Sequence, residues 1–183
     1  YQNQQVFAQA VRNGLTVQVL DNAATSRIWG IEGEFSARVA EGLNVNLTAA
    51  YLNTRILDYV SEGEDYSGNK LQHSPELSLT AAVNYTYPLA NGSALFTNID
   101  ANYRSRVYFD NTERTRLSDG PVTLVNGQIG WRSPDEKFEI GAFVQNLFNK
   151  DYLLGISNID SLGVDLMSWA PPRVIGGFLR FSY

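Results

Sequence analysis

The sequence contains no cysteine, a single histidine (His73) and comparatively few charged residues. Without cysteine, neither a disulfide framework nor a thiolate metal site can form. Charged residues make up 18% of the chain, below the roughly 25% that is typical of soluble domains. Lys and Arg number 14 against 19 Asp and Glu, which gives a net charge of −5. This balance argues against a nucleic-acid-binding protein, because such proteins carry a strongly basic face.

Long apolar runs are also missing. The apolar stretches are far shorter than the ~18 residues that a membrane-spanning helix needs. Aromatic residues, in contrast, reach 12%, with 10 Tyr, 9 Phe and 3 Trp among the 183 residues. This composition excludes a helical membrane protein, a coiled coil and a disordered tail, and it favours a β-rich chain that is one domain or one piece of a larger one.

The dominant pattern in the chain is two-residue alternation, which is typical of strands because successive side chains point to opposite faces. Between Leu77 and Tyr87, for example, the odd positions are apolar or aromatic, and the even positions carry Ser, Thr, Asn or Ala. The pattern predicts eight strands, within residues 1–11 (where it is ambiguous), 31–39, 43–51, 77–87, 95–109, 123–131, 138–145 and 175–183.

The connectors between these strands alternate between short and long. The short ones, rich in Gly, Pro, Asn or Asp, are residues 40–42, 88–92 and 133–137. The long polar ones are about 58–74, 110–121 and 146–172, and a fourth is expected between about Arg12 and Ala24. This order predicts an up-and-down meander with tight turns at one rim and large loops at the other, which is typical of outer-membrane barrels.

Three features favour a transmembrane barrel over a soluble sandwich. A strand of about 11 residues, rising roughly 3.3 Å per residue and tilted by ~45°, spans about 25 Å, the height of the apolar band of such barrels. The apolar face ends in aromatic residues, as interfacial girdles do, and the opposite face carries Asn, Thr, Asp, Arg and Glu. We therefore predict an all-β, antiparallel, up-and-down transmembrane β-barrel, in which odd-numbered apolar residues from Ile31 onward face lipid and even-numbered residues face the lumen.

Specific residues resemble one family. The run from Gly141 to Tyr152 (GAFVQNLFNKDY), followed by Pro172-Arg173 and a closing alternating strand, is similar to the C-terminus of TonB-dependent outer-membrane receptors. Three earlier segments resemble that family in the same order: Gly30-Ile31-Glu32-Gly33-Glu34, Gly42-Leu43-Asn44-Val45, and Gly68-Asn69-Lys70-Leu71 with Pro75. The sequence departs from the family pattern in ending on Tyr183 where Phe is commoner, and in having Pro171 where many members have Gly.

The resemblance implies that residues 1–183 form about the last eight strands of a 22-stranded barrel, with the plug domain and TonB box outside this chain. It implies a Gram-negative outer-membrane receptor, with a periplasmic C-terminus, that works with TonB to take up a scarce nutrient. A ferric siderophore is the expected ligand, with haem, cobalamin or an oligosaccharide as alternatives. The resemblance implies no enzymatic activity and no resident cofactor, and it gives Phe181 and Tyr183 the role of an assembly signal.

Two readings from other classes stay open. A free-standing eight-stranded outer-membrane barrel would have a structural or adhesive role, since a barrel of that size closes with a filled interior. A soluble carbohydrate-binding sandwich is the third possibility. The two ends of the chain discriminate between a partial wall and a closed small barrel. We expect residues 1–11 and 173–183 to remain unpaired with each other, leaving an open, curved wall.

Five residues are candidates for ligand contact. Arg104 and Arg106 could bind an anionic ligand through charge-assisted hydrogen bonds, or else pair with lumen carboxylates or with the plug. Tyr108, Tyr152 and Trp169 lie on or beside the long loops, where aromatic rings can stack on a ligand or serve only in packing. Among catalytic and metal sites, His73-Ser74 has no acid partner, and the acidic loop could bind Ca²⁺ or simply be solvated. That loop contains Asp58, Glu62, Glu64 and Asp65.

Overall fold

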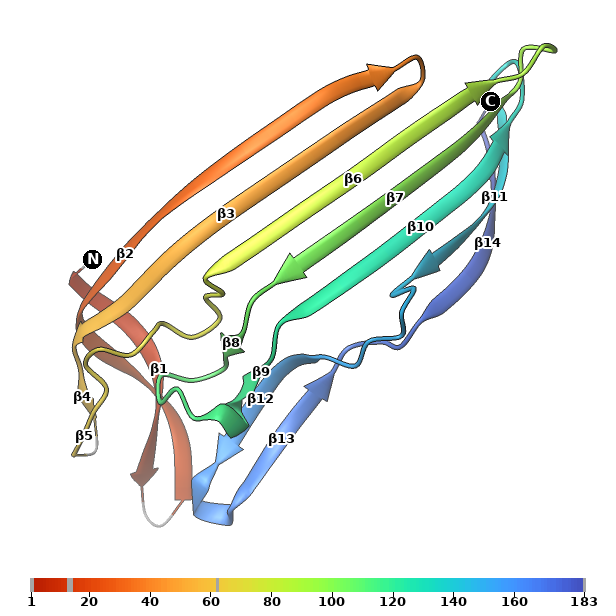
Figure 1. The fold of residues 1–183 in the computed structure, drawn as a ribbon. Helices are drawn as coiled ribbons and strands as arrows, with labels where there is room; N and C mark the ends of the chain where they lie inside the picture. Colours follow the sequence, from red (N-terminus) through yellow and green to blue (C-terminus); the bar gives the residue numbers. More distant parts are fainter. Residues whose placement is uncertain (1, 13–14, 62, 183) are drawn as a thin grey trace.

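Eight antiparallel strands form one sheet in the order β1-β2-β3-β6-β7-β10-β11-β14 (Figure 1). The computed structural model describes residues 2–12, 15–61 and 63–182. The strands of the sheet are β1 (Gln2–Arg12), β2 (Leu15–Ala40), β3 (Leu43–Asp58), β6 (Leu77–Pro88), β7 (Ala94–Arg104), β10 (Val122–Arg132), β11 (Phe138–Gln145) and β14 (Val174–Phe181).

The long loops contain small elements of their own. Each of three loops folds into a two-stranded hairpin, and two of these loops also carry a short 3-10 helix. The hairpins are β4 (Val60–Ser61) with β5 (Glu64–Asp65), β8 (Val107–Tyr108) with β9 (Ser118–Asp119), and β12 (Leu153–Ile159) with β13 (Val164–Trp169); the helices are η1 (Thr115–Leu117) and η2 (Asp160–Leu162). No helix in the described part of the chain is long and apolar enough to cross a membrane.

The predicted meander is confirmed, with one correction. Tight turns connect the strands at one end and long loops connect them at the other, as the connector lengths indicated (Figure 1). The long connector predicted between about Arg12 and Ala24 is wrong, because most of these residues belong to β2, which pairs with β1 from Leu15 to Thr25. Polar residues such as Asp21 and Asn22 resemble a loop locally, but β1 offers them a continuous hydrogen-bonding partner.

A smaller difference concerns the strand predicted over residues 95–109. The strand β7 ends at Arg104, and the chain then leaves the sheet to form β8.

Among the tight turns, the one between β2 and β3 depends on Gly42, which has a φ of +72°. A Cβ atom at this position would lie 2.1 Å from the backbone oxygen of Thr86, so the turn requires glycine both for its conformation and for its close approach to β6.

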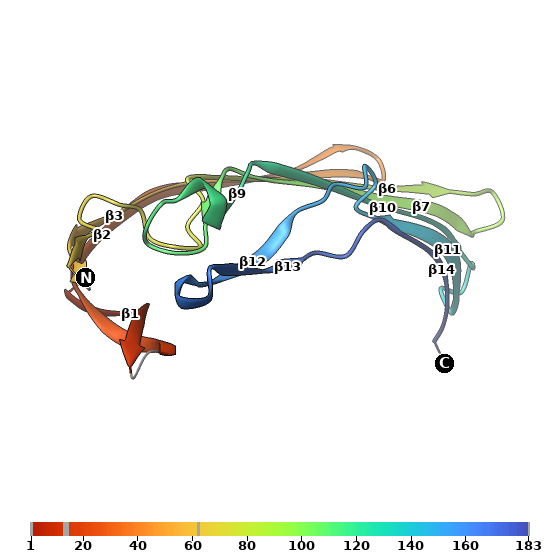
Figure 2. The same cartoon turned by 90° about the horizontal axis from the view of Figure 1, so that it is seen from below.

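The sheet is an open, curved wall, as expected. Figure 2, viewed along the wall, shows an arc with the two ends of the chain at its opposite ends. Within the described residues, β1 pairs only with β2 and β14 pairs only with β11, so the terminal strands form the two edges of the sheet. The closed eight-stranded barrel would have required a ladder between these two strands.

The two faces of the wall differ as the alternation predicted, with one correction for β11. The β12–β13 hairpin lies on the concave side of the arc (Figure 2). Its connecting arms help to enclose a pocket that Asn98 and Asp100 of β7 also line. Ile99 therefore points to the convex side, where it is 48% exposed. Leu79 and Leu179 lie on the same face, and the side chain of Leu179 is 66% exposed. The convex face is thus apolar and uncovered.

The odd-and-even rule is wrong for β11. There Ile140 pairs with Trp131 and Leu179 and so lies on the convex face, while Phe143 and Gln145 line the concave pocket.

Aromatic side chains mark both ends of the convex apolar face. Trp29 and Tyr51 pack with their ring centroids 5.6 Å apart near the long-loop end. Tyr51 pairs with Leu77, and Tyr87 lies ten residues further along β6, a distance of about 33 Å at the usual strand rise. With a strand tilt of ~40°, this corresponds to a band of about 25 Å, the apolar height of a transmembrane barrel.

Candidate ligand-binding site

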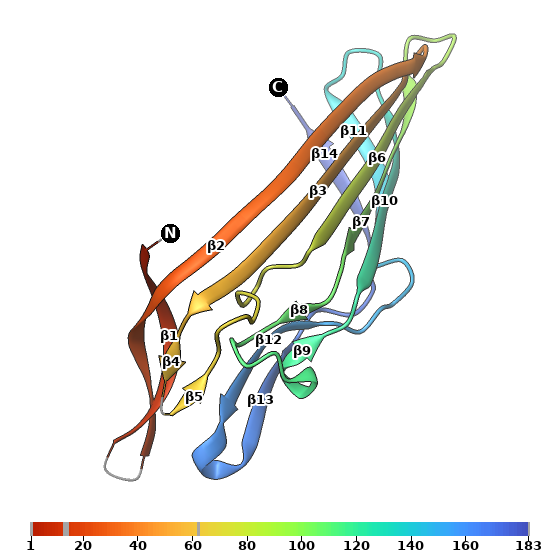
Figure 3. The same cartoon turned by 60° about the vertical axis from the view of Figure 1, so that its left-hand side comes forward.

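The three long loops fold onto the concave side and pack there through small apolar clusters. Ile56, Tyr59 and Leu71 form one cluster between the end of β3 and the following loop. Val107 and Phe109, from the loop after β7, pack with Leu153 at the start of β12 in a second cluster. Figure 3 shows the hairpins of these loops grouped at the end of the wall opposite the tight turns. The loops therefore form a covering layer with its own packing.

Polar contacts connect the first two of these loops. The Asn69 side-chain amide donates to the Asn111 carbonyl oxygen over 2.7 Å. The backbone N–H of Lys70 donates to a Glu113 carboxylate oxygen over 2.8 Å. Asn111 is buried, and no described residue donates to its side-chain oxygen. These contacts hold the segment after β5 against the segment after β8.

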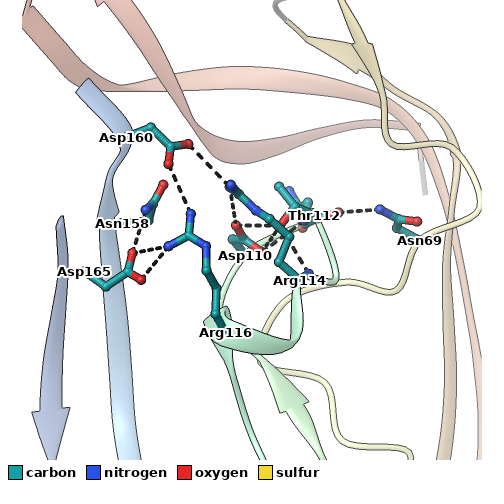
Figure 4. Close-up of polar contacts among 9 residues, drawn as sticks. Asn69, Asp110, Thr112, Arg114, Arg116, Asn158, Asp160 and Asp165 are labelled. Atoms are coloured by element: carbon teal, nitrogen blue, oxygen red, sulfur yellow. Dashed lines mark hydrogen bonds and ion pairs between the residues drawn. The ribbon is translucent and has the colours of Figure 1, made fainter. Parts of the chain in front are cut away.

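Ion pairs connect the loop after β7 to the β12–β13 hairpin (Figure 4). Arg116 binds the Asp165 carboxylate and also lies 3.1 Å from the Asp160 carboxylate. Arg114 lies 3.5 Å from Asp160 and 3.5 Å from Asp110. The Asn158 side-chain amide also donates to Asp165, over 2.6 Å. We call this group the loop latch: Asp110, Arg114, Arg116, Asn158, Asp160 and Asp165.

The loop latch shifts the protonation equilibria of its strongest pair. The hydrogen bond from Arg116, followed by that from Asn158, holds the pKa of Asp165 below its usual value. The same contact with Asp165 raises the pKa of Arg116. Both groups therefore remain charged over the pH range in which most proteins function, and the latch is a contact between full charges.

The predicted arginines Arg104 and Arg106 lie behind this layer. Arg104 at the end of β7 binds the Asp119 carboxylate, which also accepts from the backbone N–H of Leu153 over 3.3 Å. Arg106 donates to the Ser118 hydroxyl over 2.7 Å. Arg104 was expected either to bind an anionic ligand or to pair with a carboxylate, and the structure shows it paired with a carboxylate of this chain. The role of Arg104 in ligand binding stays a prediction.

The three predicted aromatic residues are separated in space. Tyr152 lines the pocket on the concave wall. Trp169 lies across the β12–β13 hairpin from Leu153 and is 58% exposed. Tyr108 is half-buried in β8, where its carbonyl oxygen accepts from the backbone N–H of His73 over 2.9 Å. The structure therefore brings Tyr152, but neither of the other two rings, to the pocket.

The pocket has a volume of about 450 Å³ and is situated between the wall and the arms of the β12–β13 hairpin. Its volume lies within the ~300–1,000 Å³ range of small-molecule sites. The wall contributes polar side chains from β7, β10 and β11, and the arms contribute one aromatic ring and two prolines. The principal lining residues are Asn98, Asp100, Asn126, Gln128, Phe143, Gln145, Tyr152, Pro171 and Pro172.

A network of amides around Asp100 orders the floor of the pocket. The side-chain amides of Asn102 and Asn126 each donate to the same Asp100 oxygen over 2.7 Å. The Asn126 side-chain oxygen accepts from the backbone N–H of Asn146 over 3.0 Å, so both ends of this amide are fixed. The alternation had placed these residues on the lumen face. The contribution of Pro171 and Pro172 was missed, because no local signal shows where the long connector of residues 146–173 returns to the wall.

The remaining candidates lie in the loops. The ring of His73 meets Phe109 edge-on with centroids 5.4 Å apart. Across the described residues, no three His, Cys, Asp or Glu side chains come together as a metal site. In the acidic loop, Glu62 lies outside the described residues, and the Asp65 carboxylate accepts from the backbone N–H of Ser67 over 2.8 Å.

The predicted assembly signal belongs to the last strand. Phe181 is exposed on the convex face, and Tyr183 lies outside the described residues.

Comparison with known families identifies the wall. The family model described as TonB dependent receptor-like, beta-barrel matches residues 1–147. The chain belongs to this family. It is a family of receptors and transporters, not a class of enzymes, and the described strands form part of its antiparallel β-barrel.

Solved structures show the same fold. The ferric yersiniabactin uptake receptor FyuA from Yersinia pestis is 20% identical, with a TM-score of 0.77 over 98% of this chain. The siderophore receptor PiuA from Acinetobacter baumannii is 17% identical, with a TM-score of 0.67 over 86% of this chain. BauA, the ferric preacinetobactin receptor from the same organism, is 18% identical, with a TM-score of 0.66 over 96%. The chain spans 29%, 22% and 25% of these three proteins, respectively.

Proposed function

We propose that this chain is the C-terminal barrel wall of an outer-membrane receptor that takes up a ferric siderophore in a TonB-dependent manner. The observation that carries the proposal is the match of 98% of the chain to a ferric siderophore uptake receptor, over an open wall with one apolar and one polar face. The plug and TonB box would belong to another part of the receptor. The C-terminus would face the periplasm, because β14 ends beside the tight turn before β11 and barrels of this type have short periplasmic turns.

In this proposal the convex face contacts lipid and the long loops face outward. The concave wall, together with Arg104, Arg106, Tyr108, Tyr152 and Trp169, would form part of the path that the ligand follows. The free-standing small barrel is disfavoured by the unpaired edges of the wall, since every backbone group within a membrane needs a hydrogen-bonding partner. The polar concave face similarly disfavours a sandwich, whose inner faces are apolar.

The test uses the gene for the whole receptor. Cells that carry it and cells that lack it would be grown under iron limitation and supplied with ⁵⁵Fe bound to a panel of siderophores. We expect receptor-dependent uptake of at least one ferric chelate, and we expect that uptake to stop when TonB is deleted or the proton gradient is collapsed. Uptake that continues without TonB, or no receptor-dependent uptake of any ferric chelate, would overturn the proposal.

A further inference from the structure

The concave pocket lacks the cations that an anionic ligand needs. We propose that it accepts a neutral part of a ligand that carries hydroxyl or amide groups. This inference rests on the proposed siderophore function. It means that the wall selects neutral ferric chelates over anionic ones, for example ferric tris-hydroxamates over ferric tris-catecholates. The complex of Fe³⁺ with three hydroxamate groups, each of charge minus one, is neutral. The complex of Fe³⁺ with three catecholate groups, each of charge minus two, has a charge of minus three.

The first support is the set of side chains that line the pocket. Asn98, Asn126, Gln128 and Gln145 are amides that both donate and accept hydrogen bonds, so they match hydroxyl and amide groups on a ligand. None of the described residues that line the pocket is Lys, Arg or His. Its charged side chain is Asp100, which would repel a negatively charged chelate.

The second support is the way in which Asp100 is held. Two side-chain amides, from Asn102 and Asn126, donate to one of its oxygens, and neither donor carries a positive charge. The negative charge is therefore solvated by dipoles and not neutralised by a cation. An anion that enters the pocket would face an uncompensated like charge, which is a common basis of discrimination against the wrong ligand.

The third support comes from three cations outside the pocket. Arg104, at the loop end of β7, is paired with Asp119. Arg114 and Arg116 in the layer above are paired with carboxylates of the loop latch. These three arginines are already neutralised by carboxylates, so an anionic ligand could recruit one of them only by breaking its ion pair.

The apolar part of the lining supports the same ligand class. Phe143 of the wall and Tyr152, Pro171 and Pro172 of the arms also line the pocket, so the amide floor lies beside apolar groups. Such a surface packs against the carbon skeleton of a ligand while the amides orient its polar groups. A neutral saccharide has the same combination of groups and is the alternative source of this chemistry.

The experiment measures the binding of three probes to the whole receptor in isolated outer membranes. The probes are a neutral ⁵⁵Fe tris-hydroxamate, a ⁵⁵Fe tris-catecholate and the neutral trisaccharide raffinose in radiolabelled form. We expect the hydroxamate to bind at least about tenfold more tightly than the catecholate, the factor that a difference of about 1.4 kcal/mol produces. Asn98→Arg places a cation in the pocket floor and is expected to reduce this preference by about tenfold.

Matched variants control for the added charge and for folding. Asn44→Arg adds the same side chain on the same face of the sheet, two strands away and outside the pocket, and is expected to leave the preference unchanged. If Asn98→Arg does not assemble, Gln145→Arg places the charge at the exposed rim of the pocket. Assembly of each variant is checked by the shift in gel mobility between heated and unheated receptor.

The outcomes of this experiment decide the inference, and the uptake experiment decides the proposed function. A catecholate preference, or a hydroxamate preference that neither pocket variant alters, overturns this inference and leaves the proposed siderophore function standing. Binding of raffinose alone, lost in the pocket variant, supports the pocket chemistry and overturns the selection of ferric hydroxamates. Absence of binding for all three probes overturns this inference, and the siderophore function is then decided by uptake of the wider panel.

Discussion

Asn146 and Asn149 hold the chain where it leaves β11 for the longest loop. Both adopt positive φ angles, of 52° and 49°, which asparagine tolerates better than most residues. The Asn146 side chain forms two hydrogen bonds of 2.9 Å with the backbone of Lys150. The Asn149 side chain accepts from the backbone N–H of Arg173 over 2.9 Å, which joins the beginning of the loop to its end. The segment that carries the family resemblance thus contains a structural clamp together with the pocket-lining residues Phe143, Gln145 and Tyr152.

The clamp predicts a graded response to substitution at Asn146. Asn146→Ala removes both side-chain hydrogen bonds at a buried position and places alanine at an unfavourable φ, with an expected cost of about 1–3 kcal/mol from the unpaired groups and ~1–2 kcal/mol from the backbone. Asn146→Gly removes the same hydrogen bonds but relieves the backbone, so it should cost less. Denaturant unfolding of the whole receptor checks this, and equal losses for the two variants would contradict the backbone contribution.

At the scale of single residues, the sequence predicted which face a side chain occupies but not which residues meet across a loop. Alternation placed Asn98, Asp100 and Asn126 on one face because strand geometry repeats every two residues. No such period applies in residues 105–121 or 146–172, so the pairing of Arg116 with Asp165 could not be predicted. These two residues are 49 positions apart, and only the folded loops bring them together.

The β12–β13 hairpin is an element whose position depends on charge. Its contacts with the loop after β7 include the loop latch, one apolar cluster around Leu153 and the hydrogen bond from the Leu153 backbone N–H to Asp119. Because the pKa of Asp165 is lowered, the stabilisation from its ion pair is complete above the ordinary value of 3.8 and is lost as the pH falls through the lowered value. The hairpin should therefore remain closed at neutral pH and loosen only in strong acid.

Spin labels test this prediction directly. Cysteines introduced by Thr115→Cys and Leu162→Cys would report the distance between the two loops in the whole receptor, and this chain contributes no competing thiol. We expect Arg116→Ala to broaden the distance distribution at neutral pH, and acidification below 3.8 to broaden that of the wild type. Arg114→Ala, whose ion pairs are longer at 3.5 Å, is the matched control with a smaller expected effect.

The last strand, β14, offers a test of the two faces of the wall. Leu179 lies on the exposed convex face, so Leu179→Arg should destabilise the membrane-inserted barrel by ~2–4 kcal/mol if the residue lies near the bilayer midplane. Its neighbour Arg180 points to the concave face and donates to Glu139 over 2.6 Å. Arg180→Ala should be mild, because Arg132 still binds Glu139 over 2.7 Å. Unfolding of the receptor in bilayers measures both, and similar costs for the two variants would contradict the face assignment.

At the scale of the whole molecule, alternation and connector lengths predicted the eight strands and the two rims, and the family resemblance together with the weak alternation of residues 1–11 predicted the open edges. The wrong part was the connector near the N-terminal end. Composition alone does not distinguish a polar loop from a strand pair such as Leu15–Thr25 with β1. The closure of the wall also depends on strands outside this chain, which no local pattern describes. The fold was therefore predictable from repeating geometry, whereas the site depends on where irregular loops return to the wall.

Assembly of the whole barrel is expected to depend on the final strand. Deletion of residues 181–183 removes Phe181 and Tyr183, the aromatic residues that resemble the family's signal for barrel insertion. We expect the truncated receptor not to appear at the cell surface, as measured by protease accessibility and by antibody labelling of an epitope in an outer loop. The double substitution Phe181→Ala and Tyr183→Ala keeps the length constant. Normal surface display of both variants would contradict the role of these residues.

The unbroken ladder from β1 to β14 also has a mechanical consequence. Shear along any strand would have to shift the register, and a shift of one residue would turn every side chain on that strand to the opposite face. The wall is therefore stiff in its own plane. Asn146 holds the beginning of the longest loop through hydrogen bonds with Lys150, and Asn149 joins that beginning to the end of the loop through its hydrogen bond with Arg173. A force applied to that loop would accordingly pass through these bonds to the wall, which acts as a fixed frame.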